Sequence, residues 1–169
     1  LDRMAANAGM RVDQFLTVKE AGIRIGGEGA YFKEATATIV LSECLPVISI
    51  SIERGGKTDF FKTYDGVRET RSGADWATFV AQAGNAAGAK VRGPYETVEI
   101  PMTLASGERV GLTPSMTGAA YFTDFYAAAK AAGHSASEPL EVKLTHMVRK
   151  NKNGNEWGVI KFELIGPAE

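Results

Sequence analysis

The strongest pattern along this chain is a strict alternation of apolar and polar residues over 140–165. Apolar side chains occupy alternate positions from Leu140 to Val148, interrupted only by His146, and again from Ile160 to Leu164. A period of two is typical of β-strands, whose successive side chains point to opposite faces. The polar segment 150–155 between the two runs includes Asn153-Gly154, which favours a turn. The pattern therefore predicts a long C-terminal β-hairpin with a basic tip.

Three more strands are expected over 31–64, and another over 96–104. Isoleucine alternates with serine over 48–52, and Gly55-Gly56 supplies a turn. In the strand that follows, Phe61 and Thr63 lie on one face, whereas Phe60, Lys62 and Tyr64 lie on the other.

Two helices are predicted, near 73–87 and 118–132. Apolar residues at positions 76, 79, 80 and 83 fall on one face of a helix, with Ser72 as the expected N-cap. Aromatic residues between Tyr121 and Tyr126 give the second helix its apolar stripe, and Gly133 is expected to end it. We expect four of these aromatic residues to lie in the core: Trp76, Phe79, Phe122 and Phe125.

The order of these elements is strands, helix, strand, helix and hairpin. Strands and helices do not alternate regularly, which argues against a parallel doubly wound sheet. No linker or low-complexity tract divides the chain, so we expect a single domain over 1–169. Its fold class is α+β and mostly antiparallel β: a weakly patterned segment over 1–30, then a small barrel over 31–165 with two helical insertions.

Composition narrows the possible classes of protein. The chain has 169 residues, with 19 Lys and Arg against 20 Asp and Glu, so its net charge is −1. This balance excludes a broadly basic protein, and the composition excludes disordered, collagen-like and coiled-coil chains. The single cysteine, Cys44, excludes an internal disulfide and a cysteine-based zinc site; its apolar neighbours predict a buried, inert thiol. No apolar stretch is long enough to span a membrane and no signal peptide is visible, so we expect a soluble intracellular protein.

Residues suited to catalysis are few. The two histidines, His134 and His146, occur in no known catalytic spacing, and we expect His146 to be a hydrogen-bonded strand residue. Three acidic residues close in sequence, Asp59, Asp65 and Glu69, could bind a divalent ion in a nuclease-like site. Acidic residues near turns are usually solvated, and the prediction is therefore no enzyme, no metal and no cofactor.

The hairpin is the better candidate for function. Between Lys143 and Lys161 it has five cations and one anion, a local charge of +4. Trp157 lies on the same strand face as Lys161, where it can stack on a base or pack on a neighbouring element. Cations that follow phosphates, together with aromatic rings that stack on bases, are typical of single-strand binders. The candidate residues of the hairpin are Lys143, Arg149, Lys150, Lys152, Trp157 and Lys161.

Two smaller sets combine the same residue types. Phe60, Lys62 and Tyr64 place two aromatic rings around one cation on a single strand face. Lys90 and Arg92, in an expected basic loop, precede Tyr95. We expect the three sets to share one sheet face; the alternative for Phe60 and Tyr64 is that they are core residues.

The hairpin, with its segment 153–159, and the strand 96–102 before an inserted helix resemble the phage-encoded single-stranded DNA-binding proteins with an OB-fold. The resemblance covers mainly the C-terminal half. It implies a five-stranded antiparallel barrel that coats single-stranded DNA in replication or recombination. It also implies DNA contacts by the hairpin residues named above and by Phe60, Lys62 and Tyr64, and a location in the host cell cytoplasm. The chain departs from many members of this family in having no acidic run at 166–169.

The leading hypothesis is therefore sequence-independent binding of single-stranded DNA without catalysis. The alternative is a β-rich structural or assembly protein of virion type, in which the basic hairpin contacts an acidic neighbour and Trp157 anchors the interface. A metal-dependent nuclease is the third hypothesis. The sequence leaves open whether the chain forms homo-oligomers, and whether it contacts replication or recombination proteins.

Overall fold

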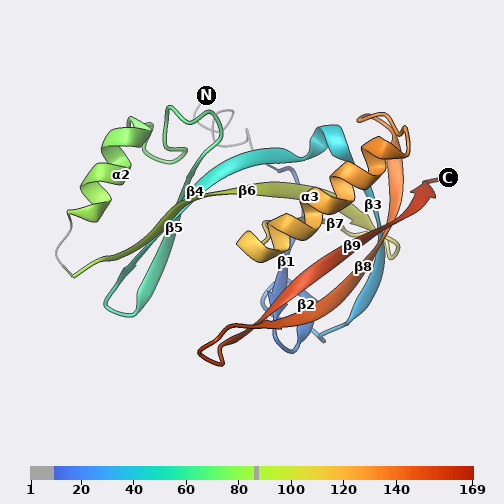
Figure 1. Ribbon diagram of the computed structural model, residues 1–169, viewed down its shortest axis with the longest axis horizontal. Coiled ribbons are helices and arrows are strands. Elements are labelled where there is room, and N and C mark those ends of the chain that lie inside the picture. The colour runs from blue at the N-terminus through green and yellow to red at the C-terminus, as the bar shows by residue number, and fades with distance from the viewer. Residues whose placement is uncertain (1–9, 86–87) are drawn as a thin grey trace. The chain divides into compact units, whose positions relative to one another are not determined.

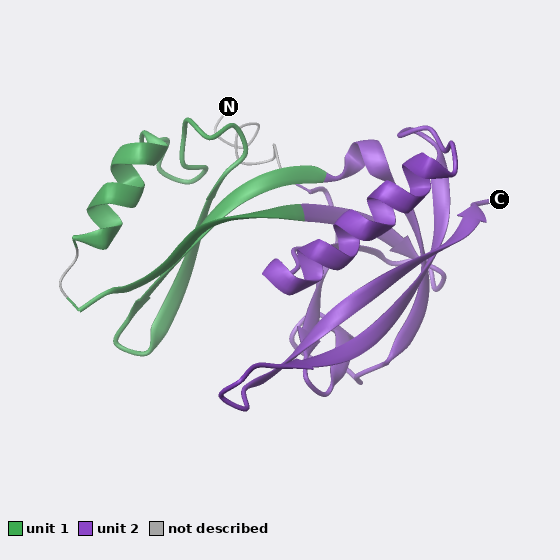
Figure 2. Ribbon diagram, in the orientation of Figure 1, with its two compact units in different colours: residues 1–9, 45–98 green, residues 10–44, 99–169 purple. Residues whose placement is uncertain are grey.

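The computed structural model describes residues 10–85 and 88–169, and the chain divides into two compact units (Figures 1 and 2). Of the described residues, unit 1 holds 45–85 and 88–98, and unit 2 holds 10–44 and 99–169. Both units are built mainly from β-strands with one α-helix each. The α+β class predicted from the sequence is therefore confirmed.

Unit 1 contains a three-stranded arrangement and one helix. Its elements are β4 (Leu45–Arg54), β5 (Lys57–Thr63), the first part of β6 (Lys90–Leu104) and α2 (Trp76–Gly84). β4 pairs antiparallel with β5 and also pairs with β6. Ile50 lies opposite Phe61, and Ser51 lies opposite Phe60. Because opposite residues share a face, this register confirms the predicted division of β5 into two faces. The predicted basic loop at 90–94 is wrong, since these residues begin β6.

Helix α2 packs on one face of this sheet. Ile50 and Ile52 of β4 form a buried cluster with Trp76 and Ala83 of α2, and Val91 of β6 packs against it. Asp75 caps the helix by accepting a hydrogen bond from the backbone N of Thr78 at 3.1 Å. The predicted N-cap was Ser72, which instead donates to the buried carboxylate of Glu69. The helix consequently begins later than predicted.

Unit 2 is a curled sheet with one long helix. The hydrogen-bonded order is β2-β1-β7-β6-β3-β8-β9, and the pairs are antiparallel except for β1 and β7, which are parallel. The predicted C-terminal hairpin is confirmed as β8 and β9. Besides the last part of β6, the elements are β1 (Gln14–Lys19), β2 (Gly22–Ile25), β3 (Glu34–Val40), a 3₁₀ turn (Leu41–Glu43), β7 (Arg109–Leu112), α3 (Met116–Ala131), β8 (Pro139–Lys150) and β9 (Glu156–Pro167).

The sheet does not close into the predicted barrel. Its order begins at β2 and ends at β9, and no ladder joins β9 to β1 in the described residues. The end of β1 instead meets the β8–β9 hairpin: His146 Nε2 on β8 donates to the backbone carbonyl of Lys19 at 2.7 Å, and Gly158 on β9 lies against the same carbonyl. This bond confirms the expected hydrogen-bonded role of His146. The segment 1–30, predicted to lie outside the barrel, supplies β1 and β2, so the sheet begins at Gln14 rather than near residue 31.

Helix α3 covers part of this sheet (Figure 1). Phe122 and Phe125 are buried and their rings lie 5.4 and 6.0 Å from the ring of Phe162 on β9. Together with Trp76, these two residues confirm the predicted aromatic core, and Phe79 is partly buried against the cluster of unit 1. Over the described residues, neither helix has the length and hydropathy needed to cross a bilayer.

Candidate nucleic-acid interface

The face of the unit 1 sheet turned away from α2 carries most residues of the two smaller predicted sets. Phe60 and Lys62 flank Phe61, which packs against the α2 cluster, so they point to the opposite side. Tyr64 directly follows β5, and its ring lies beside the Lys62 ammonium. Lys90 and Arg92 flank Val91, which also packs on that cluster, and they too point away from α2. We call these five residues the aromatic–cation face.

Phe60 is the most accessible ring on the aromatic–cation face. Its side chain is 64% exposed, which excludes the alternative that it is a core residue. The neighbouring ring of Tyr64 is partly buried, and the ammonium of Lys62 lies 5.2 Å from its centroid. The loop after β5 holds this strand, because Arg71 Nη2 donates to the Phe60 carbonyl at 2.6 Å and the Thr70 N–H donates to the Lys62 carbonyl at 3.0 Å. The strand therefore presents one exposed aromatic ring beside a ring–cation pair.

Tyr95 lies further along β6 and is less accessible. Burial raises the pKa of its hydroxyl above the usual value. A Cβ at Gly93 would lie 2.9 Å from the backbone oxygen of Ser49 and 2.9 Å from the Tyr95 ring. Glycine is therefore required where β6 approaches β4. Lys90 and Arg92 are exposed, so β6 contributes accessible cations and a partly covered ring.

The largest predicted set, that of the C-terminal hairpin, lies on β8 and β9 in unit 2. Arg149, Lys150 and Lys152 are exposed at its end, and none has an ion pair within the described residues. Trp157 lies opposite Arg149 in the register and is partly buried. We call these four residues the hairpin tip. The Trp157 ring is less accessible than the ring of Phe60. Glu156 lies opposite Lys150 in the register, so the uncompensated charge of the hairpin tip is that of Arg149 and Lys152.

Two predicted cations lie nearer the middle of the hairpin. Lys143 Nζ is 3.7 Å from Glu34 Oε1 on β3, and the residue opposite Lys143 on β9 is Glu163. Lys161 is exposed and lies opposite Thr145. Acidic residues on β3 and β9 therefore offset part of the positive charge counted along the sequence. Of the hairpin cations, those with neither an ion pair among the described residues nor an acid opposite them are Arg149, Lys152 and Lys161.

Asp65 and Glu69, two of the acidic residues considered as metal ligands, are held by hydrogen bonds to nearby residues. Asp65 Oδ1 accepts hydrogen bonds from Thr63 Oγ1 and from the backbone N of Val67 and Arg68, at 2.8 to 3.0 Å. These bonds lower the pKa of Asp65. Glu69 is buried and accepts bonds from the loop that follows it. Among the described residues, no three His, Cys, Asp or Glu side chains are grouped to hold a metal ion.

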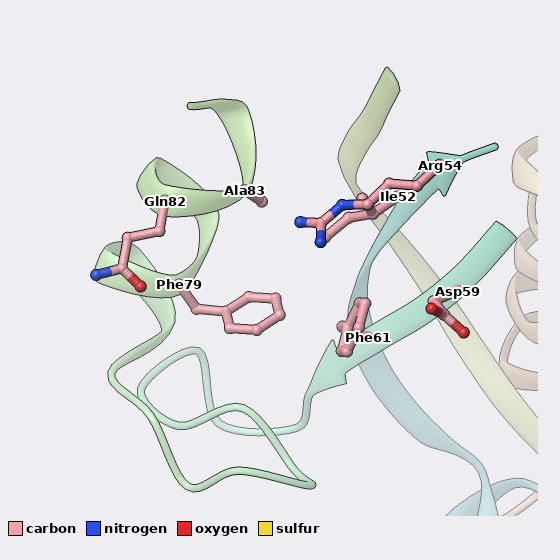
Figure 3. Close-up of a pocket in the computed structure, with 7 residues that line it drawn as sticks. All are labelled: Ile52, Arg54, Asp59, Phe61, Phe79, Gln82 and Ala83. Carbon is pink, nitrogen blue, oxygen red and sulfur yellow. The ribbon is translucent and has the colours of Figure 1, made fainter. Parts of the chain in front are cut away.

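Unit 1 also contains a cavity of about 230 Å³ between α2 and the end of the β4–β5 hairpin (Figure 3). Phe61, Phe79 and Ile52 supply apolar walls, and the side chain of Arg54 extends from β4 toward α2. Asp59 lines the same cavity but makes no ion pair with Arg54. The cavity lies on the α2 side of the sheet, so it is separate from the aromatic–cation face.

One group of exposed residues in unit 2 was not predicted from the sequence. Strand β1 turns Leu16 inward, while Phe15 on the adjacent position is 57% exposed. On β2 the guanidinium of Arg24 lies 4.7 Å from the ring of Tyr31, which is 39% exposed. The signal was available in the short alternation of 15–19, but β1 has only six residues and glycines interrupt the segment that follows.

Comparisons with known proteins add no relative to this description. No family model, no curated protein and no solved structure matches the chain.

Proposed function

We propose that this protein binds single-stranded DNA without sequence specificity, through phosphate contacts and base stacking. The observation that carries the proposal is Phe60, an exposed ring on a strand, with the Lys62–Tyr64 pair beside it and Lys90 and Arg92 on the same face. A base can stack on such a ring, and neighbouring cations can follow the phosphates.

The hairpin tip supports the same function in unit 2. Three exposed cations, against the single anion Glu156 opposite Lys150, form a local positive site in a chain of net charge −1. An OB-fold for unit 2, and with it a role in replication or recombination, belongs to this proposal. The curled, mostly antiparallel sheet, the helix packed on it and the approach of β1 to β9 support that fold.

Fluorescence anisotropy with a labelled oligothymidine tests the proposal. Each phosphate neutralised on a single strand contributes about −0.7 to the slope of log K against log salt. Wild-type protein is expected to bind at 50 mM salt and to weaken steeply on raising the salt. Replacing Arg149 and Lys152 by Gln is expected to make the slope shallower by about 1.4. Absence of binding at low salt would refute the proposal.

Phe60→Ala tests the stacking contribution. Loss of one stacked base costs about 1–3 kcal/mol, so affinity is expected to fall roughly 5- to 160-fold, with the salt slope unchanged. Met116→Ala is the matched control, because Met116 is 63% exposed and lies on α3 of unit 2. Lys130→Gln, on the same helix, controls for the loss of one charge. Equal effects of Phe60→Ala and Met116→Ala would argue against stacking at Phe60.

The assembly alternative makes a different prediction in the same preparation. A protein that used Phe60 or Trp157 as an interface anchor would form ordered oligomers without nucleic acid, and the alanine variants would dissociate them. Light scattering on DNA-free protein distinguishes the two functions. A monodisperse species that binds oligothymidine supports the proposal, and DNA-free oligomers that do not bind it support assembly.

A further inference from the structure

A second strip of aromatic and cationic residues lies in unit 2, on the outer side of the β1–β2 hairpin. Leu16 is opposite Ile25 and Val18 is opposite Ile23, and Leu16 and Ile23 are buried, so this pair of faces turns inward. The alternate residues therefore point outward. The outward residues, with the ring that packs on them, are Phe15, Thr17, Lys19, Arg24 and Tyr31, which we call the β1–β2 strip.

The two rings of the β1–β2 strip are accessible. Phe15 is 57% exposed and Tyr31 is 39% exposed. Thr17 lies directly opposite Arg24 and its hydroxyl donates to the Gly26 carbonyl at 2.7 Å, so the small residue between the rings is held against its own hairpin. The strip thus presents two exposed aromatic rings and the short polar side chain of Thr17.

The charges of the β1–β2 strip are uncompensated. The guanidinium of Arg24 lies 4.7 Å from the Tyr31 ring, and its Nε has no hydrogen-bond partner among the described residues. Lys19 is exposed, and its side chain makes no ion pair within residues 10–85 and 88–169. Three acids lie nearby along the chain: Asp13 directly precedes β1, and Glu20 and Glu28 lie in the turns at either end of β2. The two strands themselves carry two cations and no anion, and a negatively charged partner fits their outer side.

The β1–β2 strip also contacts the β8–β9 hairpin, the other element of unit 2 for which we propose DNA contacts. The backbone carbonyl of Lys19 accepts from His146 on β8 and lies against Gly158 on β9. Gly158 is next to Trp157, which belongs to the hairpin tip. Lys19 of the β1–β2 strip and Trp157 of the hairpin tip therefore lie close together within unit 2.

We infer that the β1–β2 strip is a second contact surface for single-stranded DNA, with bases stacking on Phe15 and Tyr31 and phosphates meeting Lys19 and Arg24. This inference rests on the proposed function. It predicts that the DNA bound by unit 2 continues from the hairpin tip over the outside of β1 and β2.

Two changes test this inference by anisotropy with oligothymidine. Phe15→Ala is expected to weaken binding roughly tenfold and to leave the salt slope unchanged, whereas Lys19→Gln combined with Arg24→Gln is expected to make the slope shallower by about 1.4. Ile165→Ala is the matched control for Phe15, since Ile165 is 54% exposed on β9 of the same unit. Circular dichroism of each variant verifies that the protein is folded.

Photocrosslinking locates the contact directly. Oligothymidine carrying 5-iododeoxyuridine is expected to form adducts on the peptides that contain Phe15 or Tyr31. If wild-type protein binds DNA, but no adduct forms there and Phe15→Ala behaves like Ile165→Ala, the β1–β2 strip is not a contact and the proposed function stands. If wild-type protein does not bind oligothymidine at low salt, both proposals fail.

Discussion

Gly158→Ala is expected to destabilise unit 2, because no side chain fits between β9 and β1 at this position. A Cβ on Gly158 would lie 2.1 Å from the backbone oxygen of Lys19 and 2.9 Å from His146 Nε2. Ordinary van der Waals contact begins at 3.4 Å, so the Lys19 carbonyl would have to retreat by about 1.3 Å. That retreat takes the carbonyl away from His146, whose Nε2 donates to it at 2.7 Å.

The expected loss of stability is about 3 kcal/mol. A buried donor left without its acceptor costs about 1–3 kcal/mol, and forcing an extra carbon into a packed site costs a similar amount. For a chain of this size, that loss lowers the midpoint of thermal unfolding by about 6–12 °C.

The assay uses the position of the two tryptophans. Trp76 lies in unit 1 and Trp157 in unit 2, so in a Trp76→Phe background the fluorescence of Trp157 reports on the unfolding of unit 2. Gly166→Ala is the matched control, because Gly166 is on the same strand and has no atom within 4 Å of an added Cβ. In a double-mutant cycle, His146→Ala should cost less in the Gly158→Ala protein than in wild type, since the bond is already broken. If Gly158→Ala unfolds within about 1 °C of Gly166→Ala, β1 does not pack against β9 as described.

Three further predictions concern other parts of the molecule. In urea unfolding, Phe60→Ala should leave the free energy of unfolding of unit 1 nearly unchanged, whereas Phe61→Ala should lower it by about 2–4 kcal/mol, because the Phe61 ring lies 4.9 Å from the Phe79 ring in the α2 cluster. Equal effects would mean that the two faces of β5 are misassigned. Burial, and then the charge of Glu43, raises the pKa of Cys44 to about 12. The thiol therefore stays protonated at pH 8 and should react with iodoacetamide far more slowly than in urea-unfolded protein. A rate equal to that of the unfolded chain would contradict this. Hydrogen bonds from Arg68, Val67 and Thr63 hold the pKa of Asp65 below 3.8. The contribution of Asp65 to stability is therefore present above pH 3.8 and is lost as the pH falls through the lowered pKa. Asp65→Asn should reduce the loss of stability on acidification from pH 5 to pH 2, and an unchanged pH dependence would count against those bonds.

Much of the local structure follows from the order of residues. The period of two in β8 and β9, and the separation of Phe60 from Phe61 on β5, depend only on the geometry of a strand. The aromatic spacing of the helices predicts their buried faces for the same reason. Helix starts were predicted less well: Asp75 and Ser72 can both cap a helix, and Glu69 takes the hydroxyl of Ser72.

The candidate site was predicted in part, and the missing part depends on partners distant in sequence. Local charge identified the hairpin tip, but the pairing of Lys143 with Glu34 arises only because β3 lies beside β8. The β1–β2 strip was not recognised, because Phe15 and Arg24 become neighbours only when a short hairpin folds and its inner residues meet the rest of unit 2.

The sequence by itself determined which residues can lie on opposite faces of a strand or on one stripe of a helix, since these faces follow from the period of the backbone. Only the tertiary structure decided which strands are neighbours, that the sheet of unit 2 stays open between β9 and β1, and which cations keep an uncompensated charge. Strand pairing is made by backbone groups that every residue possesses, so the side chains specify the faces of a strand far more strongly than its neighbours.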